Sequence, residues 1–126
     1  MIDRGLGVFA AVNMMIAVAA GAFGAHGLRR VLSPEMLAVW QTAVTYQMAH
    51  ALGILCIAMA SARMPAAQLH WAGWVLGLGV VLFSGSLYLL ATTGMRWLGP
   101  VTPIGGLAFL VGWGMLAWRL WRTPSL

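Results

Sequence analysis

The chain has 126 residues, of which 62% are hydrophobic and only 7% are charged. Soluble domains carry roughly a quarter charged residues, so a soluble fold of this length would have too few charges to cover its surface. The composition therefore argues against a soluble enzyme and indicates one integral membrane domain over residues 1–126. The net charge is +5, but the arginines are scattered between apolar runs, so no basic face forms and nucleic-acid binding is not expected.

Four apolar runs follow one another along the chain, at about residues 6–26, 37–62, 71–92 and 101–121. Each run has about the 20 residues that a helix needs to cross the hydrocarbon layer of a bilayer. Backbone groups in lipid must be paired internally, so these runs are expected to be helices. The sequence thus predicts an all-α membrane protein, a four-transmembrane-helix bundle with short loops.

The breaks between the runs carry signals for helix ends. Ser33 is suited to cap the second helix, with Pro34 in the first turn and Glu35 at the positive end of the helix dipole. Thr102, followed by Pro103, is expected to cap the fourth helix in the same way.

The distribution of arginines between the two sides of the membrane gives a weak orientation signal. With four spans, the side of the termini carries Arg4, Arg63, Arg119 and Arg122, and the other side carries Arg29, Arg30 and Arg96. Four arginines against three predict that both termini lie in the cytoplasm.

Small residues recur at helical spacing in three of the runs. The expected packing positions are Gly21 and Gly24 in the first run, Gly73 and Gly77 in the third, and Gly105 and Gly112 in the fourth. Such stripes let helices approach closely in lipid, where packing replaces the hydrophobic effect. They are expected to face one another inside the bundle; the alternative is that one of them is an exposed dimer face.

The second run carries a polar stripe into the membrane. Thr42, Tyr46 and His50 are four residues apart, and Gln47 lies beside them. Polar side chains at this depth usually point into the bundle interior. They either join helices, with His50 bonded to Tyr46, Ser84 or Asn13, or form a site for a proton, a ligand or a quinone-like headgroup.

Metal and catalytic constellations are not expected. His26, His50 and His70 lack the spacing of a ligand motif, so no metal or other cofactor is predicted. The chain has only two carboxylates, Asp3 and Glu35, and nothing indicates that they converge on one acid–base site. We therefore expect a protein that is not an enzyme.

Three sequence blocks occur together: GAFGAHGL at residues 21–28, AVTYQMAHALG at residues 43–53, and FSGSLYLLATTGMRWLGPVTPIGGL at residues 83–107. In their order and spacing they resemble the YgdD-like family of uncharacterised inner-membrane proteins, defined by domain of unknown function 423. The small eukaryotic transmembrane protein 256 group is similar. The resemblance implies a four-span protein of the bacterial inner (cytoplasmic) membrane and draws attention to His26, Tyr46, Gln47 and His50, but it implies no mechanism.

Two functions remain open at this point. The first is a structural or accessory component that contacts a larger membrane complex, or a second copy of itself, within the lipid bilayer. The alternative is a small carrier, a channel or a lipid-headgroup-binding protein that uses the stripe of Tyr46, Gln47 and His50. Its candidate ligand-binding residues are His26, Tyr46, Gln47, His50 and Ser84.

Overall fold

The computed structural model describes residues 1–124 and consists of four long helices in this range, with no strand. The helices are α1 (Arg4–His26), α2 (Pro34–Ala60), α3 (His70–Thr93) and α4 (Val101–Arg122). Short 3-10 turns lie in the connections: η1 (Leu28–Arg30), η2 (Pro65–Ala67) and η3 (Arg96–Leu98). All four helices are long and apolar enough to cross a membrane. The predicted fold class, an all-α bundle of four membrane helices, is confirmed.

Local sequence signals set several of the helix ends. The hydroxyl of Ser33 caps α2 by accepting a hydrogen bond from the Met36 amide at 3.2 Å, as predicted. The role predicted for Thr102 was wrong. α4 begins one residue before it without a side-chain cap, and the Thr102 hydroxyl instead lies 2.6 Å from the hydroxyl of Ser86 on α3. Thr102 therefore joins two helices.

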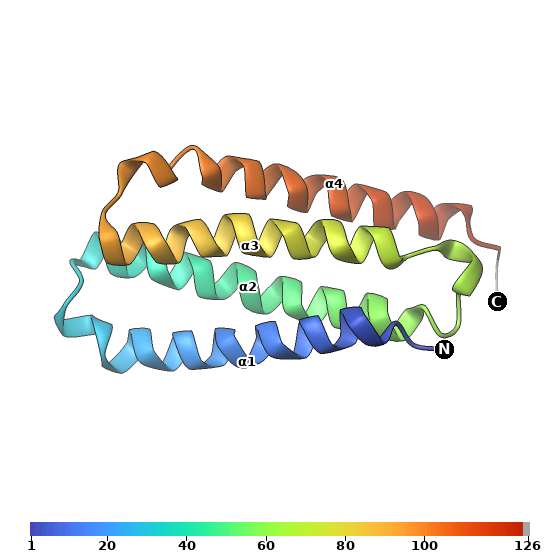
Figure 1. The fold of residues 1–126 in the computed structure, drawn as a ribbon, viewed down its shortest axis with the longest axis horizontal. Coiled ribbons are helices and arrows are strands. Elements are labelled where there is room, and N and C mark those ends of the chain that lie inside the picture. Colours follow the sequence, from blue (N-terminus) through green and yellow to red (C-terminus); the bar gives the residue numbers. More distant parts are fainter. Residues whose placement is uncertain (125–126) are drawn as a thin grey trace.

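The helices pack in chain order, so that each contacts the next one along the sequence. α2 and α3 form the middle of the bundle, and Figure 1 shows α1 and α4 on opposite sides of them. α1 also touches the start of α3, whereas α1 and α4 do not meet within the described chain. The two middle helices are consequently more buried than the two outer ones, which present wide apolar surfaces to lipid.

Large side chains fit onto the predicted packing glycines. The facing groups are Val44 at Gly21, Trp40 at Gly24, Leu6 at Gly73, Phe9 at Gly77, Phe83 at Gly105 and Leu76 at Gly112. The glycine stripes were expected to face one another, but they do not. Each opens a hollow for the side chains or main chain of a neighbouring helix, which gives close contact without leaving a void.

Gly105 provides a test of this packing. A Cβ at this position would overlap the main chain of Phe83 on α3, so Gly105→Ala is expected to lower the free energy of unfolding by about 1–3 kcal/mol. Gly114 on the same helix has open space around the position of a Cβ, and Gly114→Ala should be neutral or slightly stabilising. Unfolding of the detergent-solubilised protein in an SDS titration measures both, and equal values for the two variants would contradict the tight contact.

Candidate functional site

The polar stripe of α2 divides into three different environments. Gln47 points into the bundle between α1 and α3, with only 4% of its surface exposed. His50 is also buried and points towards α4, whereas Tyr46 is 42% exposed. The stripe is thus not one continuous site, because neighbouring positions on a helix face different neighbours.

Gln47 stands at the centre of a hydrogen-bond chain that joins three helices. Its amide nitrogen donates to the side-chain oxygen of Asn13 on α1 at 3.1 Å, and its amide oxygen accepts from the Tyr88 hydroxyl on α3 at 2.6 Å. Asn13 in turn donates to the main-chain oxygen of Phe9 at 2.9 Å. Within the membrane no water can replace these bonds, so the chain fixes the rotation of α1, α2 and α3 relative to one another.

His50 makes one hydrogen bond with each ring nitrogen. Nδ1 lies 2.8 Å from the main-chain oxygen of Tyr46, and Nε2 lies 3.0 Å from the indole nitrogen of Trp113 on α4. A carbonyl oxygen only accepts and an indole N–H only donates, so this geometry assigns a neutral imidazole with its proton on Nδ1. Phe109 stacks on the ring with the centroids 3.7 Å apart. Both nitrogens are therefore used within the bundle.

The other two candidate residues, Ser84 and His26, lie in separate surroundings. The Ser84 hydroxyl donates to the main-chain oxygen of Ala43 at 2.8 Å and joins α3 to α2. His26 is exposed at the last residue of α1 and forms no part of the stripe. Asn13, a candidate partner of His50 in the sequence analysis, bonds to Gln47 instead, and the bonds from Tyr88 to Gln47 and from Trp113 to His50 were not expected. A tryptophan well inside the fourth run, away from the membrane interface, was the available signal for Trp113.

Among the residues that the structure describes, Tyr46 differs from the rest of the stripe because its side-chain polar group has no hydrogen-bond partner. It lies near the middle of α2, and its ring packs against Phe83 and Phe109, with centroids 4.5 Å and 6.1 Å away. Within the described chain, no side chain or main-chain group is hydrogen-bonded to its hydroxyl. The same part of the structure holds no group of three or more His, Cys, Asp or Glu side chains with the geometry of a metal site.

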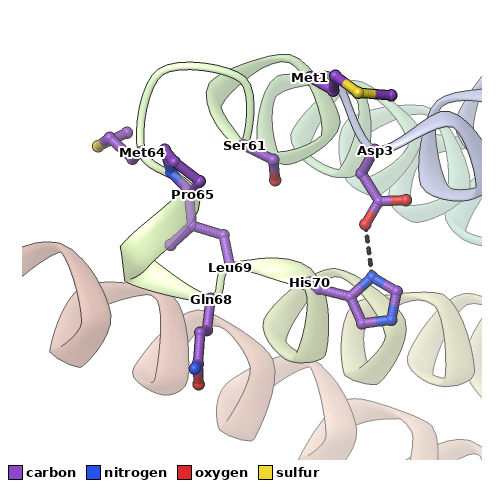
Figure 2. A pocket seen from close by; sticks show the side chains of 8 residues that line it. All are labelled: Met1, Asp3, Ser61, Met64, Pro65, Gln68, Leu69 and His70. Atoms are coloured by element: carbon purple, nitrogen blue, oxygen red, sulfur yellow. Dashed lines mark hydrogen bonds and ion pairs between the residues drawn. The ribbon is translucent and has the colours of Figure 1, made fainter.

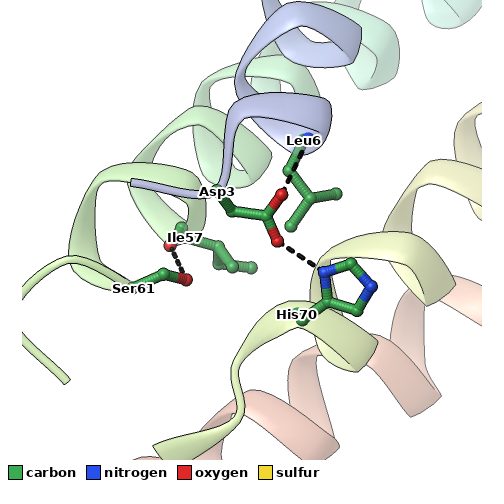
Figure 3. A network of polar contacts seen from close by, with 5 residues as sticks. All are labelled: Asp3, Leu6, Ile57, Ser61 and His70. Atoms are coloured by element: carbon green, nitrogen blue, oxygen red, sulfur yellow. Dashed lines mark hydrogen bonds and ion pairs between the residues drawn. The ribbon is translucent and has the colours of Figure 1, made fainter. Parts of the chain in front are cut away.

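A second polar feature lies at the end of the bundle that carries the chain termini. A pocket of about 210 Å³ opens there, and Figure 2 shows its lining residues, among them Asp3, Ser61 and His70. Asp3 and His70 are joined by a 2.5 Å contact between the carboxylate and Nδ1. The other carboxylate oxygen of Asp3 accepts from the Leu6 amide and caps α1 (Figure 3). One carboxylate thus fixes the start of α1 and links it to the start of α3.

The hydrogen bonds at Asp3 determine its ionisation. Burial by itself would raise the pKa of this carboxyl, but the hydrogen bonds from His70 and the Leu6 amide outweigh burial and bring the pKa below its ordinary value of 3.8. The ionised form of Asp3 is therefore the form that the folded protein stabilises.

A double-mutant cycle tests the bond between Gln47 and Tyr88. Gln47→Leu and Tyr88→Phe each leave a buried polar group without a partner, and each is expected to cost about 1–3 kcal/mol of unfolding free energy. Since both remove the same bond, their coupling is expected at about 0.6–1.7 kcal/mol. Thr92→Val, which removes a hydroxyl bonded only to its own helix, is the control. A coupling of zero would show that the bond does not contribute.

Acid should weaken the contact between Asp3 and His70. The pKa of Asp3 is lower in the folded than in the unfolded protein, so ionised Asp3 stabilises the fold fully above its ordinary pKa. This contribution is lost as the pH falls through the lowered pKa of the folded protein. The thermal midpoint of the solubilised protein is thus expected to drop between about pH 5 and about pH 2. Asp3→Asn should reduce this drop, whereas Glu35→Gln, at the opposite end of the bundle, should preserve it. The same drop in all three proteins would contradict the assignment.

Comparison with known proteins places the chain among membrane proteins of unknown function. The model of the family described as "Protein of unknown function (DUF423)" matches residues 20–106. A UPF0382 membrane protein of Staphylococcus saprophyticus, SSP2132, is 52% identical over 109 residues, which cover 86% of this chain and 90% of the relative. The UPF0382 membrane protein YwdK of Bacillus subtilis is 44% identical over 110 residues, which cover 86% of this chain and 89% of the relative.

No solved structure matches this chain. The relatives and the four candidate spans identify a bacterial multi-pass membrane protein. The family resemblance noted in the three sequence blocks is confirmed, since the matched residues include nearly all of them. The chain therefore belongs to the DUF423 family of membrane proteins, whose relatives carry the name UPF0382.

Proposed function

We propose that the protein is a non-catalytic structural or accessory component of the cytoplasmic membrane and acts through helix–helix contacts. The observation that carries the proposal is the half-exposed Tyr46 near the middle of α2, with its hydroxyl unpaired within the described chain. In hydrocarbon an unsatisfied hydroxyl is unfavourable by several kcal/mol, on the order of 4–8 for transfer to an alkane. A partner helix on this face would supply the missing hydrogen bond.

The other polar groups of the stripe support contact between helices over ligand binding. The amide nitrogen and oxygen of Gln47 are bonded to Asn13 and Tyr88, and the ring nitrogens of His50 are bonded to the Tyr46 carbonyl and to Trp113. Neither residue lines the pocket that contains Asp3 and His70, or the apolar groove of about 340 Å³ between α2 and α4. A carrier or channel would need polar groups free to bind its substrate.

The exposed part of α2 around Tyr46 has the polarity of a contact surface. Gln41, Thr42, Thr45 and Tyr46 are all exposed there, and we call them the α2 polar face. The hydroxyls of Thr42 and Thr45 bond to main-chain oxygens one turn earlier, each at 3.0 Å. They can also bond across to a second helix, as hydroxyls do between membrane helices. Because the backbones of α2 and α4 are apart and these four residues are exposed, the face is open to a partner.

We also propose that both termini lie in the cytoplasm. The termini and the connection between α2 and α3 lie at one end of the bundle (Figure 1). That end carries four arginines in or beside its loops against three at the other end, which is the bias of the positive-inside rule.

Photocrosslinking in native membranes tests the contact at Tyr46. A benzophenone amino acid at position 46 is expected to give a protein adduct, because the partner helix lies directly over this position. The same probe at Met15, on the exposed face of α1, is the control and should react with lipid alone. Mass spectrometry of the adduct identifies either a larger membrane protein or a second copy of this chain.

The proposal fails if position 46 also gives only lipid adducts. A lipid whose headgroup crosslinks at Tyr46 would instead favour the alternative, a small carrier, channel or headgroup-binding protein that uses Tyr46, Gln47 and His50. A variant tests the hydroxyl of Tyr46 apart from its ring. With the benzophenone at position 42, Tyr46→Phe should weaken the protein adduct if the hydroxyl bonds to the partner.

A further inference from the structure

Two polar side chains on the open side of α2 have no hydrogen-bond partner within the described chain. They are the amide of Gln41 and the hydroxyl of Tyr46, and both residues are exposed. The Gln41 amide lies beside Gly24 of α1, whereas the Tyr46 ring packs on Phe109 of α4. The two groups therefore stand at opposite edges of the exposed surface of α2, where hydrocarbon offers no hydrogen bond.

A line of exposed residues runs along α2 between these two edges. Its members alternate four and three residues apart, which is the heptad spacing of helices that pack in parallel along their length. We call this line the α2 seam: Ala38, Thr42, Thr45, Ala49, Leu52, Cys56 and Met59. The first four residues of the seam are small, which lets a second helix approach closely beside Gln41 and Tyr46.

The polar groups distinguish α2 from the two outer helices. The same spacing occurs on the exposed faces of α1 and α4, but there the exposed side chains in the middle of the helix are apolar, as at Val12, Met15 and Leu110. Lipid chains cover such a face without leaving a polar group unpaired. Only on α2 does contact with a second helix satisfy hydrogen-bonding groups that the described chain leaves free.

The spacing of Gln41 and Tyr46 matches a pair of identical helices. With Thr42 and Thr45 at heptad positions a and d, Gln41 takes position g and Tyr46 takes position e of the next heptad, five residues further along. In a parallel pair, position g of one helix faces this position e of the other helix. Each Gln41 therefore faces the Tyr46 of a second copy. An amide and a phenol each both donate and accept, so the two groups complement each other.

We propose that the partner at the α2 polar face is a second copy of this chain, packed α2 against α2 as a parallel pair. In this pair the Gln41 amide of each copy is hydrogen-bonded to the Tyr46 hydroxyl of the other copy. The inference rests on the partner contact proposed above and names the partner. One symmetric contact satisfies all four unpaired groups, two from each copy.

The charges along α2 are compatible with this pairing. Copies inserted in the same orientation are related by a twofold axis along the membrane normal, so each residue of the seam lies at the same depth as its equivalent. The chain has no arginine, lysine, aspartate or glutamate between Glu35 and Arg63. Like charges are therefore not brought together along the seam.

Disulfide crosslinking in native membranes tests the pairing. Thr42→Cys and Thr45→Cys, each in a Cys56→Ala background, place one thiol on the seam, and each should give a disulfide-linked dimer on mild oxidation. The controls Met15→Cys on α1 and Leu110→Cys on α4 are equally exposed to lipid and should stay monomeric. No dimer at positions 42 and 45, or equal yields at the two control positions, would overturn the inference.

The reciprocal bond is tested by the dimer affinity in mild detergent, measured by sedimentation equilibrium. Gln41→Leu and Tyr46→Phe should each weaken the dimer roughly tenfold, because each removes both symmetric bonds, taken at the average strength found between membrane helices. The double variant should be no weaker than either single one, since the same bonds are lost. Thr92→Val, which removes an exposed hydroxyl of α3, should leave the affinity unchanged. Unchanged affinity in both single variants, or additive losses in the double variant, would contradict the bond.

The benzophenone at position 46 separates failure of this inference from failure of the proposed function. An adduct with a different membrane protein, without disulfide dimers at positions 42 and 45, would overturn the second copy as partner and leave the helix contact standing. Lipid adducts alone would overturn both. An adduct of twice the mass of the chain, together with both disulfides, is the expected result.

Discussion

Close contact between helices is the constraint on which the rest of this structure depends. In lipid the outer and inner faces of a helix are equally apolar, so burial gives little net drive for association and the helices must be held by packing. Gly73 and Gly77 receive α1, Gly105 and Gly112 bring α4 onto α3, and Gly24 accepts Trp40 of α2. Each contact places a large group in a glycine hollow, and together they set the order of the four helices.

Polar bonds add specificity to this packing. Each pair of neighbouring helices has at least one of them: Gln47 with Asn13 between α1 and α2, Ser84 with the Ala43 carbonyl between α2 and α3, and Ser86 with Thr102 between α3 and α4. Such bonds are each worth well under 2 kcal/mol in membrane proteins. Their main effect is to select one rotation of each helix, because any other rotation leaves an amide or hydroxyl unpaired in hydrocarbon.

The arrangement in chain order leaves one side of the bundle unlike the others. The backbones of α2 and α4 are kept apart by α3, and the two helices meet through side chains: Phe109 stacks on His50 and Tyr46, and Trp113 is bonded to His50. The exposed Tyr46 lies in one half of α2 and the apolar groove in the other. The proposed partner contact follows from this open side, because it uses a hydroxyl that the packing of the helices leaves free.

The sequence by itself determined the four helices, the family and part of the helix ends, because hydropathy, the three sequence blocks and a cap such as Ser33 are read from neighbouring residues. Only the tertiary structure decided which side chains meet. The partners of Gln47 and His50 are 34 to 63 positions away, and Asp3 pairs with a residue 67 positions away. The physical reason is that these contacts join separate helices, and the pattern of a largely apolar helix does not reveal which neighbouring helix an inward side chain will meet.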